Sequence, residues 1–284
     1  MKISIVTPSF NQAQYLEATL RSVLEQQYPE LEYVVMDAGS SDGSVDVIRR
    51  YEDRLAYWVS EPDRGHADGL NKGFAHTSGE VMAWINSSDA YYPWTLRTVA
   101  QIFNDVPEAQ WITGMPTALS EGVEPKLVYE SAWNLYDFLS GNYHWVQQES
   151  VFWRRSLWET AGGALDVTAR YACDFELWCR FMEHAPLYHV PTILGGYRYH
   201  DERRGREVEG GGRAYPREAA EIYARWSPRF SEQDRWKANV VRITNNELGR
   251  VVRKSLKKAG LLRWYRHPRV AYDMESRRWV GASA

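Results

Sequence analysis

The sequence predicts an α/β domain with a mostly parallel sheet covered by helices on both faces, followed by a helical C-terminal region. Strand-like and helix-like hydrophobic patterns alternate over the first ninety residues, and such alternation is typical of parallel sheets whose connections are helices. The chain has 284 residues, of which 44% are hydrophobic, so it can bury a sizeable core. Beyond about residue 205 the pattern is helical only.

Four short apolar runs are the predicted strands: residues 3–6, 31–36, 55–59 and 81–85. Between them, apolar residues recur at helical spacing over residues 16–24, 45–48 and 65–75. The switch between these two periods predicts a strand–helix repeat. Turn-forming residues separate the segments, above all the cluster at residues 37–43.

Charge and cysteine content exclude several classes of function. The 34 basic and 37 acidic residues give a formal net charge of -3, so no nucleic-acid partner is expected. Cys173 and Cys179 suit neither a disulfide framework nor a zinc site, and we expect reduced thiols. The N-terminal apolar run is too short for a signal-peptide core, and no stretch approaches the roughly 20 apolar residues of a spanning helix. A cytoplasmic location is therefore expected.

Polar clusters follow three of the predicted strands: TPSFN, DAGSSDGS and NSSD. Ligands of such sheets bind beyond the carboxyl ends of the strands. Asp37 and Asp42 can accept hydrogen bonds from a nucleobase or ribose, and residues 7–10 can form a backbone cradle, although these are also ordinary turn residues. Neither G-x-G-x-x-G nor G-x-x-x-x-G-K-[ST] is present. This argues against a dehydrogenase, a P-loop enzyme and a nucleotidyltransferase.

Taken together and in order, the clusters resemble glycosyltransferase family 2, a group of inverting enzymes with the GT-A fold. The resemblance spans Ser4 to His200, about two thirds of the chain. It is carried by the strings SIVTPSFNQAQYLEATLRSVLEQQYP, EYVVMDAGSSDGS, SEPDRGHADGLNKGF, SGEVMAWINSSDAYYP, QQESVFWRRSLWETAGG, YACDFELWCRF and GGYRYH.

The resemblance implies a nucleotide-sugar site at the strand ends. Thr7, Pro8 and Ser9 would line the base pocket, Asp37 would face the uracil or other base, and the helix after the third strand would approach the ribose and phosphates. The residues that it assigns to the nucleotide are Thr7, Pro8, Ser9, Asn11, Asp37, Asp68, Lys72, Ser88 and Asp89.

The family's acidic metal motif is only half present. Two adjacent aspartates usually follow the fourth strand, but Ser88 stands where the first is expected. Asp89 is then the implied ligand of Mn²⁺ or Mg²⁺, with His200 as a second ligand. Such a cation neutralises the charge that accumulates on a leaving diphosphate. The alternatives are that Asp89 is a turn or helix-capping residue and that His200 is an exposed residue at a strand end.

The resemblance assigns the catalytic base to Asp174, at the start of a predicted helix. An inverting transfer needs one group that takes the proton of the acceptor hydroxyl. The same position would allow Asp174 to cap the helix. Glu176 is the second choice for the base, and Asp166 in the preceding loop is the third.

Acceptor and donor-sugar contacts are assigned to residues before and within the predicted strand at residues 150–153. Gln148, Glu149 and Trp153 are the residues chosen, the alternative for the polar pair being an ordinary strand entry. Trp145, Trp153 and Trp178 are either sugar platforms or core residues, and the sequence does not separate these roles.

The C-terminal region divides into three segments. Residues 201–212 are charged and glycine-rich, which suggests a loop that acts as a lid. Residues 217–226 and 236–248 are helical in pattern. Residues 250–269 are basic and interleaved with apolar and aromatic residues, which favours peripheral contact with anionic lipid at the inner face of the membrane. The alternative is a solvated helix packed by its apolar stripe.

The predicted domains are a GT-A domain at residues 1–205, with its nucleotide-binding part at about 1–115 and its acceptor part at about 116–205, and a linker with helices at 206–284. The predicted function is inverting transfer of a sugar from a nucleoside-diphosphate donor, UDP being favoured, to a saccharide or lipid-linked saccharide in cell-surface glycan synthesis. The alternative is a non-catalytic homologue that binds nucleotide sugars or glycans, which the loss of one motif aspartate to Ser88 favours.

Overall fold

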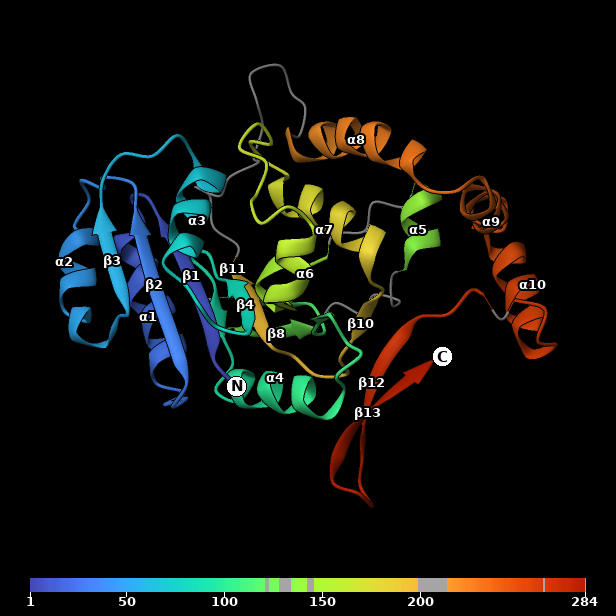
Figure 1. Ribbon diagram of the computed structural model, residues 1–284, viewed down its shortest axis with the longest axis horizontal. Coiled ribbons are helices and arrows are strands. Elements are labelled where there is room, and N and C mark those ends of the chain that lie inside the picture. Colours follow the sequence, from blue (N-terminus) through green and yellow to red (C-terminus); the bar gives the residue numbers. More distant parts are fainter. Residues whose placement is uncertain (121–122, 128–133, 142–145, 199–213, 263, 284) are drawn as a thin grey trace.

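The computed structural model describes residues 1–120, 123–127, 134–141, 146–198, 214–262 and 264–283. Within these residues, a nine-stranded sheet has the spatial order β13-β12-β10-β6-β9-β4-β1-β2-β3 (Figure 1). Its strands are β1 (Ile3–Ser9), β2 (Leu31–Asp37), β3 (Tyr57–Ser60), β4 (Val81–Trp84), β6 (Trp111–Thr113), β9 (Val151–Arg154), β10 (Leu187–His189), β12 (Pro268–Asp273) and β13 (Arg278–Ser283).

The sheet is mostly parallel, as predicted. Only β9 runs antiparallel to both neighbours, and β13 runs antiparallel to β12, among the described strand pairs. In the parallel part, Ser9 pairs with Asp37 and Asp37 pairs with Ser60. The carboxyl ends of β1, β2 and β3 are therefore level with one another, and the loops that follow them meet at one edge.

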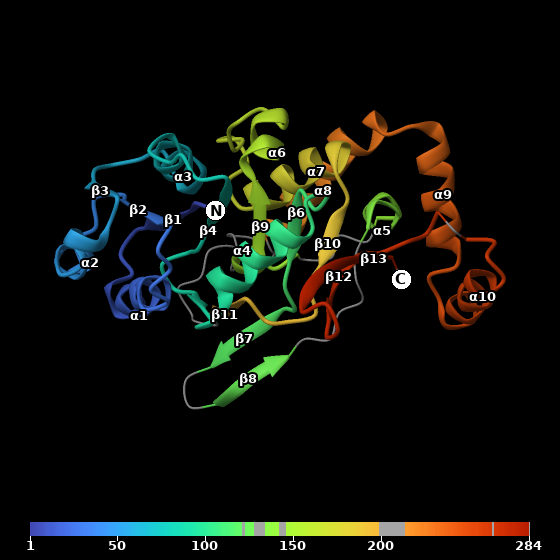
Figure 2. The same cartoon turned by 60° about the horizontal axis from the view of Figure 1, so that its bottom comes forward.

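Helices cover both faces of the sheet. With β4 seen nearly edge-on, α3, α6 and α7 lie on one side, and α1 and α4 on the other (Figure 2). The α-helices are α1 (Ala13–Leu24), α2 (Ser44–Arg49), α3 (His66–Ala75), α4 (Thr95–Asp105), α5 (Leu135–Leu139), α6 (Arg155–Thr160), α7 (Cys173–His184), α8 (Ala214–Trp226), α9 (Glu232–Ile243) and α10 (Glu247–Lys258). Short 3₁₀ turns are η1 (Glu52–Arg54), η2 (Gln148–Ser150) and η3 (Ser227–Arg229).

A second sheet lies below the first (Figure 2). Its order is β5-β11-β7-β8, with β5 (Ala90–Tyr91), β7 (Thr117–Ser120), β8 (Val123–Leu127) and β11 (Gly195–Arg198). β5 begins directly after Asp89 and pairs antiparallel with β11. This pairing brings a strand from late in the chain to the end of β4, where the acidic motif lies.

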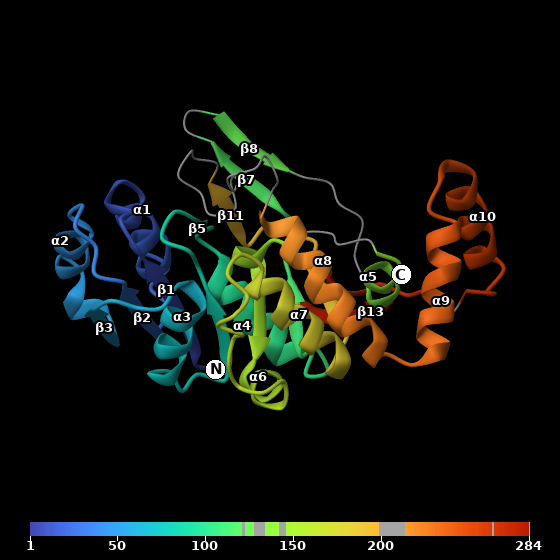
Figure 3. The ribbon, with the colours of Figure 1, turned by 90° about the horizontal axis from the view of Figure 1, so that it is seen from above.

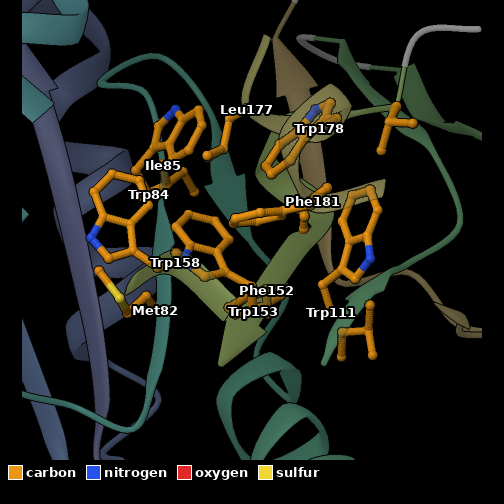
Figure 4. Close-up of a cluster of buried hydrophobic side chains, with 14 of the residues drawn as sticks. Met82, Trp84, Ile85, Trp111, Phe152, Trp153, Trp158, Leu177, Trp178 and Phe181 are labelled. Atoms are coloured by element: carbon orange, nitrogen blue, oxygen red, sulfur yellow. The ribbon is translucent and has the colours of Figure 1, made fainter. Parts of the chain in front are cut away.

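Indole rings from four elements form the centre of the core (Figure 4). Trp84, Trp111, Trp153 and Trp178 are each at most 1% exposed. Trp178 stacks on Trp84 and on Trp111, with ring centroids 5.7 and 5.6 Å apart. The prediction that Trp153 contacts substrate is wrong, because the ring points from β9 into this cluster. Trp178 is likewise a core residue, and Trp145 lies outside the described residues.

The C-terminal region contains the predicted helices but does not end as a helical appendage. Residues 268–283 form a hairpin, in which β12 joins β10 of the main sheet and β13 packs beside α4. The backbone N–H of Trp279 donates to Asp105 Oδ2 at 2.9 Å. Because Val270 and Trp279 are the only buried residues of these strands within residues 268–282, the strands carry little hydrophobic periodicity, and the sequence pattern did not reveal them.

The basic segment at residues 250–269 is not one continuous surface. Its N-terminal part is α10, but Tyr265 is buried and donates its hydroxyl to Asp137 Oδ1 at 2.7 Å. His267 Nε2 lies 3.1 Å from Asp137 Oδ2. Tyr265 and His267 therefore fasten this part of the segment to α5, while Arg266 and Arg269 remain exposed.

Candidate functional site

The loops after β1 and β2 are fastened to each other by hydrogen bonds. Asp37 Oδ1 accepts from Ser40 Oγ, and Asp37 Oδ2 accepts from Ser60 Oγ, both at 2.6 Å. Asn11 donates its N–H to Ser40 Oγ at 2.8 Å, and its Oδ1 accepts from Ser41 N at 2.9 Å. Asn11 has a φ of 50°, a left-handed conformation that asparagine tolerates. Asp37 and Asn11 thus fix the shape of the predicted base pocket.

The three residues that the sequence placed in the base pocket differ in their surroundings. Thr7 is fully buried and its hydroxyl lies 2.9 Å from that of Tyr33, so its side chain belongs to the sheet interior and not to the pocket, contrary to the prediction. Pro8 is also buried. Ser9 Oγ is buried at the end of β1 and has no hydrogen-bond partner in the described part of the chain. A buried polar atom without a partner is a natural place for a ligand to bond.

Two basic side chains lie beside Asp68 of α3: Arg64 just before the helix and Lys72 in its last turn. Arg64 donates to Asp68 Oδ1 at 2.7 Å, and this hydrogen bond lowers the pKa of Asp68. Lys72 Nζ lies 3.3 Å from Glu61 Oε1 and 3.7 Å from Asp68 Oδ2. Asp68 is buried while the Arg64 side chain is 79% exposed. Asp68 therefore holds the Arg64 guanidinium near the carboxyl ends of the strands, where its positive charge can meet a bound diphosphate.

Asp89 is fully buried at the end of β4. Its Oδ1 accepts from the backbone N–H of Arg198 at 2.9 Å, and its Oδ2 accepts from Asn86 Nδ2 at 3.2 Å. Burial raises the pKa of Asp89 to about 7. Arg198 Nε also donates to the backbone oxygen of Ser88 at 2.8 Å. The end of β11 is thereby locked to the acidic motif.

Gln148 and Glu149 lie beneath the motif and are both buried. Gln148 Oε1 accepts from Asn86 Nδ2 at 3.1 Å, and Gln148 Nε2 donates to the Trp84 backbone oxygen at 2.5 Å. Glu149 accepts from Gln147 Nε2. Burial, with the Asp89 charge as the second cause, raises the pKa of Glu149 far above its usual range. Gln148 supports the motif through these hydrogen bonds to Asn86 and Trp84, and direct contact of Gln148 or Glu149 with substrate remains a prediction.

Asp174 stands in the first turn of α7, half-buried. Its Oδ1 accepts from Phe175 N at 2.7 Å, and its carboxylate accepts from the hydroxyl of Tyr215 in α8. Burial raises the pKa of Asp174 to about 7. The N-cap of α7 is Ala172, without a side-chain cap, so the expected capping role of Asp174 is wrong. A carboxylate with this pKa is suited to general base work near neutral pH.

The other two acids considered for the base have structural partners. Glu176 is buried and its Oε2 accepts from Arg180 at 2.7 Å. Asp166 accepts from Thr168 Oγ1 at 2.6 Å and from Arg225 at 3.2 Å. Because the carboxylates of both are paired with arginines, Asp174 stays the proposed base.

The donor atoms near Asp89 fit one kind of cation site. No group of three or more His, Cys, Asp or Glu side chains able to hold a metal ion is found in the described ranges. His200 and residues 201–212 lie outside them. One carboxylate with phosphate oxygens is a common arrangement for Mg²⁺. The residues therefore fit a cation brought by a diphosphate, and they do not form a cage of their own.

Three residues that the sequence argument did not assign belong to this region: Phe10, Arg198 and Tyr215. Phe10 follows β1 directly and is 58% exposed. It stands inside the quoted TPSFN cluster, and an aromatic residue among turn-forming residues could have indicated a ring that contacts a ligand. Arg198 stands inside the quoted GGYRYH string, but its contact with Asp89 could not be inferred from that string. Tyr215 carries no local signal, because it acts on Asp174, more than 40 positions away.

The comparisons with known proteins agree with this geometry. Residues 4–163 match the model of the family described as glycosyl transferase family 2. The chain belongs to glycosyltransferase family 2. The match covers more than half of the chain and confirms the resemblance inferred from the motifs.

Known relatives align with this chain over different fractions of their own length. An uncharacterized glycosyltransferase of Mycobacterium tuberculosis is 40% identical over 90 residues, which are 31% of this chain and 34% of the relative. An uncharacterized glycosyltransferase of Rickettsia typhi is 25% identical over 211 residues, 70% of this chain and 64% of that protein. A putative teichuronic acid biosynthesis glycosyltransferase of Bacillus subtilis, TuaG, is 34% identical over 92 residues, 31% of this chain and 36% of the relative. The chain thus spans between a third and just under two thirds of these relatives.

Solved structures share the fold. TarS residues 1–349 of S. aureus, in complex with UDP-GlcNAc, superpose with a TM-score of 0.61 at 16% identity, covering 92% of this chain and 72% of that one. Mannosyltransferase PcManGT from Pyrobaculum calidifontis, in complex with GDP-Man and Mn²⁺, gives a TM-score of 0.53 at 19% identity, covering 93% and 81%. These likenesses confirm the predicted GT-A fold.

Proposed function

We propose that this protein is an inverting glycosyltransferase that moves a sugar from a nucleoside-diphosphate donor to a saccharide or lipid-linked saccharide in cell-surface glycan synthesis. UDP is the preferred nucleotide. Support for this choice comes from TarS, whose structure contains UDP-GlcNAc. The similarity to TuaG, a putative teichuronic acid biosynthesis enzyme, supports a glycan product.

The donor binds at the carboxyl ends of β1 and β2 and beside the loop that follows β4. The base stacks on Phe10 in the pocket that Asp37 and Asn11 shape, and the diphosphate lies between Arg64 and the loop that follows β4. Ser9 Oγ and Asn86 Oδ1, both buried without partners within the described ranges, are the polar atoms that the nucleotide would satisfy.

The observation that carries the catalytic part of the proposal is Asp174, a half-buried carboxylate with a pKa raised to about 7 by burial. An acceptor hydroxyl attacks the anomeric carbon as the bond from that carbon to the diphosphate oxygen breaks. Asp174 takes the hydroxyl proton, and the nucleoside diphosphate leaves with the bonding electron pair. One displacement of this kind inverts the anomeric centre.

Mn²⁺ or Mg²⁺, held by Asp89 and by the predicted second ligand His200, would supply positive charge to the departing diphosphate. Arg64 and Lys72 add fixed positive charge at the same edge. Asn86 and Gln148 hold the Asp89 carboxylate in its orientation through the hydrogen bonds described above.

The first experiment is a thermal-shift screen of UDP, GDP and dTDP with Mn²⁺, Mg²⁺ or EDTA, because a ligand that binds the native state stabilises it. We expect the largest shift with UDP and Mn²⁺. UDP-sugars that shift the protein are then assayed for release of UDP. The absence of any shift with every nucleotide would contradict the proposal.

Membrane contact is a separate part of the proposal, and it rests on α9 and α10. Their exposed apolar side chains include Ile243 and Val251, at 71% and 62% exposure, and Lys254 and Lys258 are exposed on α10. No described helix is long and apolar enough to span a bilayer. Co-sedimentation with anionic but not neutral vesicles, lost in Ile243→Ser with Val251→Ser, tests this contact. Binding that the double substitution leaves unchanged would contradict it.

A non-catalytic homologue is the second candidate, and Ser88 in the metal motif favours it. A protein of this kind would bind UDP-sugars without releasing UDP. Comparing binding and turnover in the same preparation separates the two functions.

A further inference from the structure

Helix α8 belongs to the C-terminal region, which the sequence treated as separate from the catalytic part, yet it lies along α7 (Figures 1 and 3). Two of its side chains contact the start of α7. Tyr215 bonds Asp174 through its hydroxyl, and Glu218 contacts the loop that leads into α7. The two contacts lie within one helical turn of each other on α8.

Glu218 binds three consecutive backbone N–H groups. Its Oε1 accepts from Arg170 N at 2.8 Å, and its Oε2 accepts from Tyr171 N and Ala172 N, both at 2.6 Å. Ala172 is the N-cap of α7 and offers no side-chain cap. The N–H of Ala172 is one of the backbone donors at a helix start that need a partner from elsewhere, and Glu218 of α8 provides that partner. The loop is held directly before the proposed base.

We propose that Tyr215 and Glu218 are positioning residues for Asp174, so that α8 is part of the catalytic unit rather than an appendage. Tyr215 orients the carboxylate, and Glu218 fixes the backbone that carries it. This inference rests on the proposed function, because it assigns these residues to the reaction in which Asp174 is the base.

The two residues act on the Asp174 charge with opposite sign. The hydroxyl of Tyr215 favours the ionised carboxylate, and the negative charge of Glu218 disfavours it. Glu149, on the η2 side, is the other acid that interacts with Asp174. Removing the hydroxyl should therefore raise the pKa of Asp174, and removing the Glu218 charge should lower it.

The test is the pH profile of kcat/KM for UDP release from the UDP-sugar that gives the largest thermal shift. Tyr215→Phe should move the acid limb up by about one pH unit, and so lower the rate at pH 7 by about fivefold. Glu218→Gln should move the limb to lower pH and also lower the plateau of kcat, because the loop loses acceptors. The KM for the donor should stay within about twofold of that of the unmodified protein in both variants, since neither residue lies at the strand ends.

Matched controls come from the same helix. Tyr223 donates its hydroxyl to the Leu139 backbone oxygen at 2.9 Å, so Tyr223→Phe removes a hydroxyl without touching Asp174. Glu221 is exposed and pairs with Arg217 within α8, so Glu221→Gln removes a charge of the same kind. Both controls should keep the original pH profile.

The inference is overturned if both variants fold and the acid limb of the kcat/KM profile stays in place in Tyr215→Phe and Glu218→Gln. It is also overturned if the limb moves in the same direction in both. If Tyr215→Phe does not fold, the Glu218→Gln profile decides: a downward shift supports the inference and an unmoved limb overturns it. A fully active Asp174→Asn overturns the proposed function itself. An inactive Asp174→Asn with unmoved limbs in the α8 variants overturns only the positioning role.

Discussion

Replacing Asp174 with asparagine should abolish transfer while making the folded protein more stable at neutral and alkaline pH. The side chain keeps its size, and its oxygen can still accept from Phe175 N. The loss of a general base lowers the rate by about 10²- to 10⁴-fold. Donor binding should be nearly unchanged, because the nucleotide binds at the strand ends.

The gain in stability follows from the pKa. In the folded protein, burial raises the pKa of Asp174 to about 7, from an ordinary value of 3.8. Below pH 4 the carboxyl is mostly neutral in both states, so the folded state pays little charge penalty there. Between about pH 4 and 7 the unfolded chain ionises this carboxyl while the folded protein keeps it protonated, so the folded state loses stability over this window, and above pH 7 the loss is complete and constant. About three pKa units at about 1.4 kcal/mol each set an upper bound of about 4 kcal/mol for this loss, and partial exposure makes it smaller.

Two measurements check this prediction. Initial rates of UDP release between pH 5 and 9 should rise about tenfold from pH 6 to 8 in the unmodified protein, because the ionised fraction of a group with pKa about 7 rises by that factor. Thermal unfolding should give the Asp174→Asn variant a higher Tm than the unmodified protein at pH 8.5 and a nearly equal Tm at pH 4. A flat rate profile would refute the reasoning. So would a Tm of the Asp174→Asn variant that does not exceed that of the unmodified protein at pH 8.5.

Three further predictions concern the donor site and the core. Asp89→Asn should remove the Mn²⁺-dependent part of the UDP thermal shift and leave the part seen with EDTA; an unchanged Mn²⁺ effect would exclude Asp89 as a ligand. Phe10→Ala should weaken UDP binding about tenfold in calorimetry, since base stacking on an aromatic ring contributes about 1–3 kcal/mol, and an unchanged Kd would place the base elsewhere. Trp178→Ala should lower the free energy of unfolding by about 3–5 kcal/mol in urea, and a loss below about 1 kcal/mol would contradict the stacked packing of Trp84 and Trp111 on this ring.

The nucleotide-binding half of the molecule could be predicted from the sequence because the patterns that indicate it are formed by neighbouring residues. Strands β1, β2 and β4 are runs of buried residues, and each ends in a cluster of turn-forming polar residues. Asp37, Asp89 and Asp174 could be named because each stands within a motif of its own. In each case the informative residues lie within a few positions of one another.

Burial and partners were decided by the tertiary structure. Nothing in the local sequence distinguishes Trp153, which points into the core, from an aromatic residue that faces a sugar. Thr7 was assigned to the pocket because it stands in the right loop motif, but its hydroxyl bonds Tyr33 inside the sheet. The raised pKa of Asp89 results from burial beneath β11, a strand more than 100 residues later.

From the sequence by itself, hydrophobic period and turn composition predicted the parallel half of the sheet, and the resemblance of the motifs to glycosyltransferase family 2 gave the family and the proposed base. All of these signals are properties of neighbouring residues. Only the tertiary structure decided that β12 and β13 complete the sheet and that Tyr215 and Glu218 hold the start of α7. The bond from Ala172 to Glu218 joins residues 46 positions apart, and the bond from Trp279 to Asp105 joins residues 174 positions apart. Their energies depend on which surfaces meet after folding, and no local pattern records that.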